Sequence, residues 1–111
     1  MLDPDVFPFC HEFYVVEKSI EVVVMINGDS RCVRIDALHE LKQDRYYTRA
    51  YIEENVFLEP AYPADDDARQ RESASVWAAW TVFPWTHGNS ADQVLRSALS
   101  FLGDCCRATA A

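Results

Sequence analysis

Cys10 and His11 are the only adjacent cysteine and histidine in this 111-residue chain. A thiolate beside an imidazole is a common pair in nucleophilic catalysis. Neighbouring residues of a strand point to opposite faces, however, so these two side chains cannot form that pair with each other. His39 and His87 are the other possible bases, and no sequence feature places either beside Cys10. We therefore interpret Cys10 as a small buried apolar residue rather than a catalytic thiol.

His87, Gly88, Asn89 and Ser90 come directly before a helical pattern and could bind an anion. Backbone amides at a helix N-terminus point outward and attract negative charge. A lone glycine lacks the run of residues that cradles phosphate in a P-loop. A turn followed by a helix cap explains all four residues without a ligand. That interpretation is the stronger one, and a small-ligand-binding or anion-binding protein, or a small enzyme, is the alternative.

Asp65, Asp66 and Asp67 offer carboxylate oxygens of the kind that Mg²⁺ and Ca²⁺ prefer. The run lacks the spacing and the final glutamate of an EF-hand loop, and two arginines follow it closely. We therefore expect a solvated acidic loop, with no metal and no cofactor. The chain also shows no Ser-His-Asp order, paired-carboxylate motif or nucleotide fingerprint. An enzyme is thus not indicated.

The charge of the chain is negative and unevenly distributed. Ten basic and 18 acidic residues give a formal charge of −8. Residues 53–72 contribute −5 of it, from seven acids and two arginines. A chain with this charge is repelled by nucleic acid and by anionic membranes, so we expect neither as a direct partner.

Features of the sequence that report on compartment favour a reduced, cytoplasmic protein. No apolar stretch approaches the roughly 18–20 residues of a membrane span. The N-terminus, Met1–Asp5, is acidic, which is unlike a cationic signal peptide. The four cysteines show no CxxC pair and no zinc-ribbon spacing.

All three tryptophans lie between Trp77 and Trp85, in a stretch that also contains Phe83. Tryptophan and tyrosine are common anchors of protein interfaces, although core packing is their ordinary role. We therefore expect a non-enzymatic protein-binding or regulatory module, with Trp77, Phe83 and Trp85 as candidate contacts. The acidic run Asp65–Asp67 would then steer a basic partner. A homodimer through the tryptophan strand is a second form of this hypothesis.

Hydrophobic patterns predict β-structure in the first half of the chain. Ile20–Ile26 is apolar at six of seven positions, ends at Asn27-Gly28 and leads into the alternating segment Arg31–Ile35. These features predict a hairpin over residues 20–35. Tyr46–Leu58 reads as a further extended segment. Residues 1–9 are expected to form an extended arm.

Two further segments are less clear-cut. Phe9–Val16 fits both a helical stripe and a strand, and we favour a strand, followed by a turn at Glu17–Ser19. Asp36 is placed to cap a short helix over Ala37–Lys42, in which Leu38 and Leu41 are three residues apart.

The last third predicts a strand followed by a helix. Val76–Phe83 is apolar on both faces, which favours a central strand covered on both sides, or one with a face in an interface, ending at Pro84. Ser90 and Gln93 are spaced for a reciprocal cap. The helix behind them carries an unbroken apolar stripe of Ala91, Val94, Leu95, Ala98, Phe101, Leu102 and Cys105.

These elements predict a single α+β domain over residues 1–111. The expected architecture is a two-layer sandwich, with a mostly antiparallel sheet of about five strands and the C-terminal helix packed on one face. Residues 59–74 contain Pro60 and Pro63 and lack apolar periodicity, so we expect an acidic loop there.

Residues 83–94 contain one local resemblance. Phe83-Pro84, followed by Gly88-Asn89-Ser90-Ala91-Asp92-Gln93-Val94, resembles the "FP … G-D-[ST]-x-E-E-A" signature of HicB-type antitoxins. In that family a small sheet leads into a capped helix. The similarity covers about a dozen residues, without the connecting strand or a DNA-binding tail. It implies a similar local construction rather than membership of the family.

Overall fold

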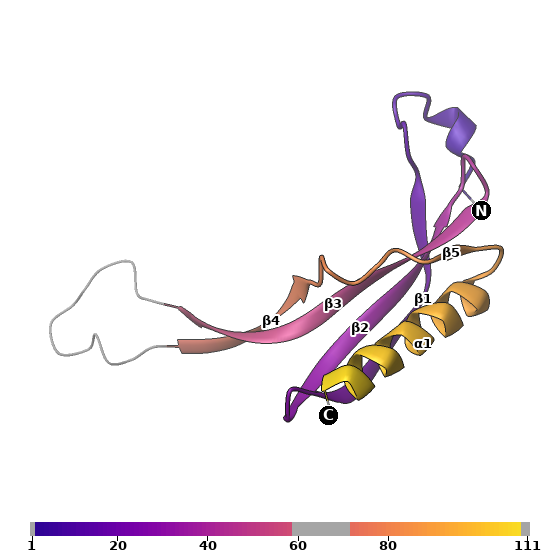
Figure 1. The fold of residues 1–111 in the computed structure, drawn as a ribbon. Helices are drawn as coiled ribbons and strands as arrows, with labels where there is room; N and C mark the ends of the chain where they lie inside the picture. Colours follow the sequence, from indigo (N-terminus) through magenta and orange to yellow (C-terminus); the bar gives the residue numbers. More distant parts are fainter. Residues whose placement is uncertain (1, 59–71, 110–111) are drawn as a thin grey trace, which may run out of the picture.

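A five-stranded antiparallel sheet with one C-terminal helix against it forms the protein (Figure 1). The computed structural model describes residues 2–58 and 72–109, with side chains described for residues 2–55 and 74–106. The strand order is β1-β2-β3-β4, and β5 also pairs with β3. This confirms the predicted α+β two-layer architecture. The elements are the 3-10 turn η1 (Pro4–Val6), β1 (Tyr14–Ile26), β2 (Asp29–Glu40), β3 (Arg45–Leu58), β4 (Glu72–Ala79), β5 (His87–Gly88) and α1 (Ala91–Thr109).

The predicted hairpin over residues 20–35 is confirmed and is longer than expected. β1 and β2 pair from Tyr14 opposite Glu40 to Ile26 opposite Asp29. Asn27 and Gly28 make the turn with φ angles of 54° and 83°. Positive φ at both central residues suits the right-handed twist of a hairpin, which is why Asn-Gly predicts it.

Four predictions for the first 42 residues are wrong in whole or in part. The strand favoured over Phe9–Val16 begins only at Tyr14, so Cys10 and His11 precede it. The expected turn at Glu17–Ser19 does not form, because β1 runs through it and absorbs one residue as an irregularity between Val16 and Lys18. The expected helix over Ala37–Lys42 does not form either, since β2 continues to Glu40 between two paired strands. The arm over residues 1–9 is not wholly extended, because it contains η1.

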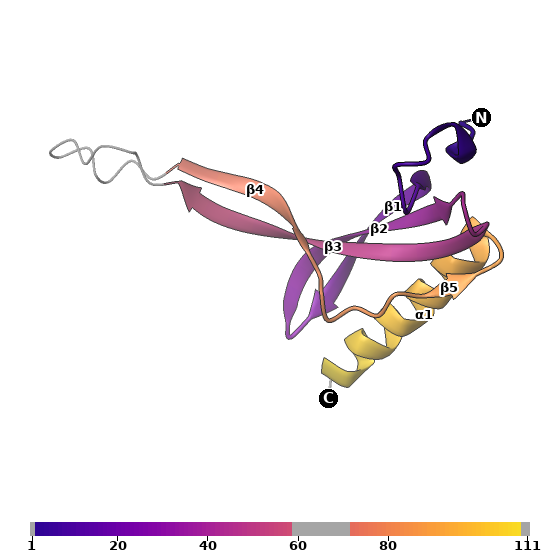
Figure 2. The same cartoon turned by 90° about the horizontal axis from the view of Figure 1, so that it is seen from above.

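The tryptophan strand is an edge strand, which corrects the predicted central position. Among the described residues β4 pairs only with β3, from Leu58 opposite Glu72 to Tyr51 opposite Ala79. It begins at Glu72, so residues 72–74 of the expected loop are strand, and residues 59–71 of that loop lie outside the described residues. It ends at Ala79 rather than at Pro84. β4 and the adjoining end of β3 extend away from α1 as a two-stranded ribbon (Figure 2).

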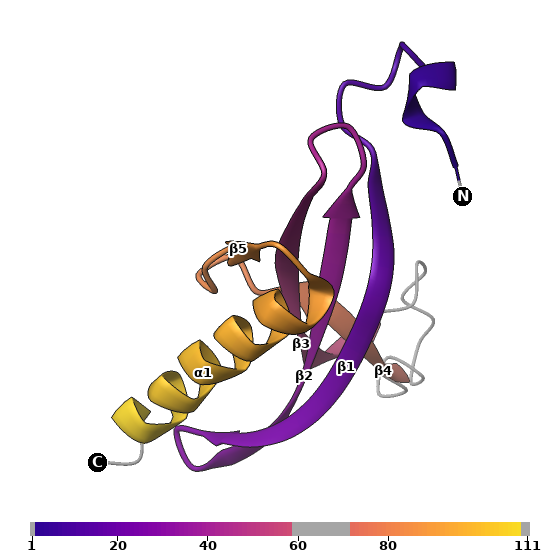
Figure 3. The same cartoon turned by 90° about the vertical axis from the view of Figure 1, so that its right-hand side faces the viewer.

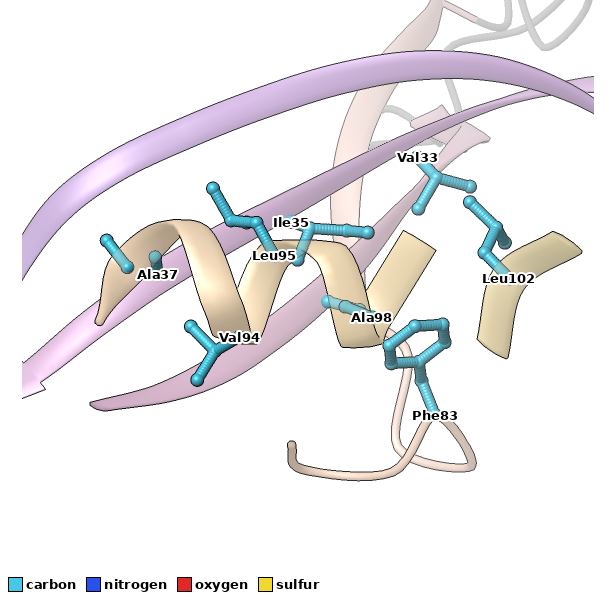
Figure 4. Packing of buried hydrophobic residues seen from close by; sticks show 10 residues of the cluster. Val33, Ile35, Ala37, Phe83, Val94, Leu95, Ala98 and Leu102 are labelled. Atoms are coloured by element: carbon cyan, nitrogen blue, oxygen red, sulfur yellow. The ribbon is translucent and has the colours of Figure 1, made fainter. Parts of the chain in front are cut away.

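The core lies between α1 and the sheet (Figure 4). Val94 and Ala98 are fully buried, as are Val33 and Ile35 of β2. Phe83 is 4% exposed, and the other buried apolar members are Ala37, Ala50, Ala91, Leu95 and Leu102. Removing a side chain such as Leu102 or Ile35 from water stabilises the fold by roughly 1.5–3 kcal/mol. Five residues of the predicted helix stripe, Ala91, Val94, Leu95, Ala98 and Leu102, thus form the seam that joins the two layers. Phe101 is 37% exposed, and Cys106 rather than Cys105 packs against the core.

The predicted reciprocal cap at the start of α1 is confirmed. The Gln93 N–H donates to Ser90 Oγ at 3.1 Å, and Gln93 Oε1 accepts from the Asn89 N–H at 2.7 Å. Just before it, the Thr86 N–H donates to Thr48 Oγ1 at 3.2 Å, and Thr86 Oγ1 donates to the Val94 carbonyl at 3.1 Å. These bonds fix the helix start to β3.

Candidate functional site

One face of the sheet is covered by α1, and the opposite face has no helix or strand packed over it among the described residues (Figure 3). Because Val33, Ile35 and Ala37 face the helix, the alternate residues of β2 and their partners face the other way. We call this side the open face. It is defined by Tyr14, Val16, Ser19, Glu21, Val23, Arg34, Asp36, Leu38, Tyr47, Arg49, Tyr51, Glu53 and Trp77.

Arg34 lies between two aromatic rings on the open face. Its guanidinium carbon is 4.4 Å from the centre of the Tyr51 ring and 5.3 Å from that of Trp77. Arg49 approaches Tyr51 as well, at 5.6 Å. Contacts of this kind between a cation and an aromatic face are worth about 0.5–1 kcal/mol when exposed and more when desolvated.

A buried carboxylate holds Arg34 in place. Asp36 is 4% exposed, and its Oδ1 lies 3.4 Å from Arg34 Nε. The geometry of this ion pair does not make it a hydrogen bond, and the buried donor Arg34 Nε has no acceptor within the part of the chain that the structure describes. Asp36 Oδ1 also accepts from Ser19 Oγ at 2.6 Å. One carboxylate therefore links β1 to the arginine of the stack.

A second aromatic group extends the open face toward the other end of the sheet. The Tyr47 ring centre is 6.2 Å from that of Tyr14 and 5.9 Å from that of Trp85. Trp85 is 56% exposed. Burial, followed by the charge of Glu12, raises the pKa of Tyr14, so its phenol keeps its proton to a higher pH than an ordinary tyrosine does. The rings therefore present a neutral aromatic surface.

The structure separates the three aromatic residues that the sequence proposed as partner contacts. Trp77 lies half-buried on the open face, and Trp85 is exposed beside Tyr47. Phe83 lies in the core, with its ring centre 5.2 Å from that of Trp80 and 5.1 Å from that of Phe101. The chain itself therefore covers Phe83. The proposed steering residues Asp65, Asp66 and Asp67 lie outside the described residues.

The residues proposed as an anion site, His87–Ser90, are used by the fold. Gly88 pairs with Tyr46 in the sheet, and His87 pairs with Tyr47. The Asn89 amide donates to the Gln93 side chain, and the Gln93 amide donates to Ser90. His87 is exposed. The cap thus occupies two of the amides that an anion would need.

Sequence reasoning missed a polar cluster around His39 at one end of the sheet. His39 Nε2 is 2.7 Å from Asp44 Oδ1, and Nδ1 is 3.5 Å from Glu17 Oε1. The imidazole stacks on Tyr46, with ring centres 4.3 Å apart. A cavity of about 170 Å³ lies beside it, lined by Leu2, Val15, Glu17, His39 and Leu41. Burial, with help from Glu17, raises the pKa of Tyr46.

Glu40 is a second residue that the sequence did not single out. It is 3% exposed and accepts three backbone N–H bonds, from Phe13 at 2.8 Å, Lys42 at 2.7 Å and Gln43 at 3.3 Å. It joins the N-terminal arm to the turn between β2 and β3. This role is structural.

The cysteines show no arrangement for nucleophilic chemistry. Cys10, Cys32, Cys105 and Cys106 are all partly buried. Burial raises the pKa of Cys32, and the charges of Glu53 and Glu21 add to the shift, so its reactive thiolate is disfavoured. Among the described residues no group of three or more His, Cys, Asp or Glu side chains could hold a metal ion.

Comparisons with known proteins add no assignment to this geometry. Within residues 2–58 and 72–109, no helix combines the length and apolar character needed to cross a membrane. The local resemblance of residues 83–94 to HicB-type antitoxins is not accompanied by a family match. Comparisons of the chain with protein-family models, curated proteins and solved structures found no match.

Proposed function

We propose that this domain is a non-enzymatic protein-binding module that docks its partner on the open face. The observation that carries the proposal is the stack of Arg34 between Tyr51 and Trp77. Tryptophan, tyrosine and arginine are the residues that most often supply the binding energy of protein interfaces. In this stack all three meet on a face that α1 does not cover.

The stack is not required to close the core of the domain. Arg34, Tyr51 and Trp77 all lie outside the hydrophobic cluster beneath α1. They are held instead by three neighbouring strands and by Asp36. Side chains already fixed in one arrangement lose little conformational entropy on binding, which favours affinity.

The ribbon formed by β3 and β4 supports the same proposal. β4 contacts β3 but not α1, so no described part of the chain supplies a second layer over β4 like the one that stabilises the rest of the sheet. A two-stranded ribbon is marginally stable in water without such a layer. A partner on the open face at Trp77 would supply part of that cover.

Charge indicates the kind of partner. The chain carries −8 and therefore attracts basic proteins at a distance. On the open face, Glu21 lies opposite Arg34, and Glu53 lies opposite Trp77. We propose a basic partner whose cations meet these carboxylates and whose apolar or acidic groups meet the stack. We also propose that the carboxylates of Asp65–Asp67 steer this basic partner toward the chain.

Affinity capture tests the proposal with a matched pair of variants. Trp77→Ala removes the ring beside Arg34, whereas Leu99→Ala truncates a side chain of α1 that is 38% exposed. A protein retained by the wild type is purified, and its Kd is measured by calorimetry. We expect Trp77→Ala to weaken binding about 30-fold and Leu99→Ala to leave it unchanged. Equal affinity of the wild type and Trp77→Ala would contradict the proposal.

The alternative function, binding of a small anion at the start of α1, has less support. Two cap amides already donate within the chain. A thermal-shift screen with inorganic phosphate and nucleotides separates the two functions, because a ligand of the folded state raises the apparent Tm. Our proposal expects no shift in this screen.

A further inference from the structure

β1 is the terminal strand of the sheet, and no strand lies along its outer side among the described residues (Figure 3). The outward N–H and C=O groups of an edge strand are ready to pair with another strand. Proteins usually guard such an edge with charges, prolines or irregularities. The last five residues of this 13-residue strand, Val22–Ile26, contain neither charge nor proline, so this part of the edge is unguarded.

We propose that the outer edge of β1 pairs antiparallel with the same edge of a second copy of the chain. The two-fold axis of this pairing passes through Val22. A symmetric dimer needs a surface that is complementary to itself. The regular part of β1 is complementary to itself in three respects: the length of the segment, the side chains on each face and the positions of the charges.

The length of the regular segment fixes the centre of the pairing. At one end the irregularity between Val16 and Lys18 shifts the pairing register of the strand. At the other end the turn at Asn27 and Gly28 stops it. The nine residues between these limits run from Lys18 to Ile26 and have Val22 at their midpoint. A two-fold at Val22 pairs the whole segment with itself.

This register places like faces together. Residues whose numbers sum to 44 lie opposite each other, so each residue meets one on the same face of the sheet. Ile20 meets Val24 on the helix-covered face, where both already pack against the core. Val22 meets its own copy there. The core of each copy therefore continues across the joint.

On the open face the register leaves no like charges opposite each other. Glu21 meets Val23 of the second copy, and Ser19 meets Met25. Val23 is 70% exposed and Met25 is 56% exposed, so pairing removes apolar surface of both side chains from contact with water. Moving the axis one residue toward the N-terminus, to Glu21, would place two glutamates face to face. The charges therefore favour Val22 over this neighbouring position.

Lys18, whose charge could otherwise disfavour pairing at this edge, forms an ion pair within the chain. Lys18 Nζ lies 2.5 Å from Asp92 Oδ1, at the first turn of α1. Its charge is thus directed toward the helix. In the proposed register Lys18 lies opposite Ile26 and does not meet another cation.

The second exposed edge, along β4, is a weaker candidate. β4 has eight residues, and the described ones are mainly alanine and serine, which have low β-propensity or little apolar surface to bury. β1 offers valine, isoleucine and methionine instead. A homodimer would therefore form through β1 rather than through the tryptophan strand that the sequence indicates.

A charge pair at Val23 tests the register. Val23→Glu places a carboxylate opposite Glu21 of the second copy, twice in each dimer, whereas Val23→Lys places an ammonium there. Sedimentation velocity over a range of concentrations gives the dimer Kd. We expect Val23→Glu to raise it by roughly tenfold and Val23→Lys to lower it. The double variant Glu21→Lys/Val23→Glu restores an attractive pair and is expected to return the Kd toward that of Val23→Lys.

Val82→Glu and Val82→Lys are the matched controls. Val82 is 80% exposed and lies outside every strand, so these variants change the net charge equally without touching β1. Neither Val82 variant is expected to change the dimer Kd. Circular dichroism checks that each variant is folded, which the exposure of Val23 and Val82 allows.

Hydrogen exchange locates the interface independently. Amides in residues 18–26 are expected to gain protection as protein concentration rises, while those in residues 72–79 do not. A chain that stays monomeric at high concentration overturns the proposal. A dimer that responds equally to Val23→Glu and Val23→Lys, or that protects residues 72–79 instead, also overturns it. Trp77→Ala leaves this dimer intact, so its outcome is separable from that of partner binding.

Discussion

Arg34 lies directly across the β2–β3 ladder from Tyr51, with its guanidinium carbon 4.4 Å from the ring centre. The contact joins two strands on the side of the sheet that the helix does not cover. Trp77 completes it from a third strand. An arginine held by these contacts would lose little further conformational freedom when a partner binds. That preorganisation is the physical basis of the proposed binding function.

Removal of the Glu40 carboxylate should detach the N-terminal arm. Glu40→Ala leaves the amides of Phe13, Lys42 and Gln43 without their acceptor. Hydrogen bonds to a charged acceptor contribute more than neutral ones, so we expect a loss of about 3 kcal/mol in the free energy of unfolding. Urea denaturation measures it, with Glu54→Ala on exposed β3 as the control. A change below that of the control would refute this role.

Gly88→Ala should destabilise the start of α1 through Gln93. A methyl group at residue 88 would lie 2.7 Å from Gln93 Oε1 and 3.1 Å from Val94 Cγ1. The flexible Gln93 side chain must move, which breaks its bond to the Asn89 amide and costs about 1 kcal/mol. Thermal unfolding of the double variant with Gln93→Ala is the check, because most of the effect should vanish in that background. Full additivity of the two changes would contradict the explanation.

The ion pair between β1 and α1 should make stability depend on pH. The hydrogen bond from Lys18, then its charge, holds the pKa of Asp92 below the ordinary aspartate value. The unfolded chain therefore takes up this proton at a higher pH than the folded protein does. The contribution of the pair is fully present above the ordinary value and is lost as pH falls through the native pKa.

Lys18→Gln tests this dependence. The difference in urea midpoint between wild type and variant should be constant near neutral pH and should shrink in acid. An NMR titration of the Asp92 carboxyl should show its pKa rising in Lys18→Gln. Arg96→Gln is the matched control, since Arg96 makes the smaller contribution, and its effect should be less. An unchanged Asp92 titration in Lys18→Gln would count against the pair.

Placing a charge at the seam between the layers should unfold the domain. Val94 is fully buried, so Val94→Asp leaves a carboxylate in the core without a partner. We expect loss of helical circular dichroism at 25 °C. Leu99→Asp, at a site that is 38% exposed, should keep it. A native spectrum for Val94→Asp would contradict the packing described here.

Local patterns predicted the parts of the fold that depend on neighbouring residues. Asn27-Gly28 indicates its hairpin because few other pairs tolerate two positive φ angles. The helix stripe and the Ser90–Gln93 cap are likewise contained within one or two turns. Such features are independent of the register between strands.

Predictions failed where distant strands decide the conformation. Leu38 and Leu41 have helical spacing, yet Leu38 lies in β2 between Val16 of β1 and Tyr47 of β3. Pairing on both sides outweighs a weak local preference. The apolar run predicts a strand that continues to Phe83, but the chain leaves the sheet after Ala79 and the Phe83 ring lies in the core.

The site was predictable only in part. Trp77 and Trp85 were singled out by residue type, and both lie on or beside the open face. Arg34 and Tyr51 were not, because they are 17 positions apart and meet only through the β2–β3 register. The sequence does indicate that each residue lies on the same face as the alternate residues of its own strand. That alternation does not determine which residues of two strands lie opposite each other.

Hydroxyl-radical footprinting of the complex tests the central claim most directly. The purified partner is added to the chain, and oxidation of aromatic side chains is measured by mass spectrometry with and without it. We predict that Tyr51, Trp77 and Trp85 become protected, while Phe83 stays unreactive in both states because the core already covers it. Protection confined to α1, with Trp77 and Trp85 as reactive in the complex as alone, would contradict binding on the open face.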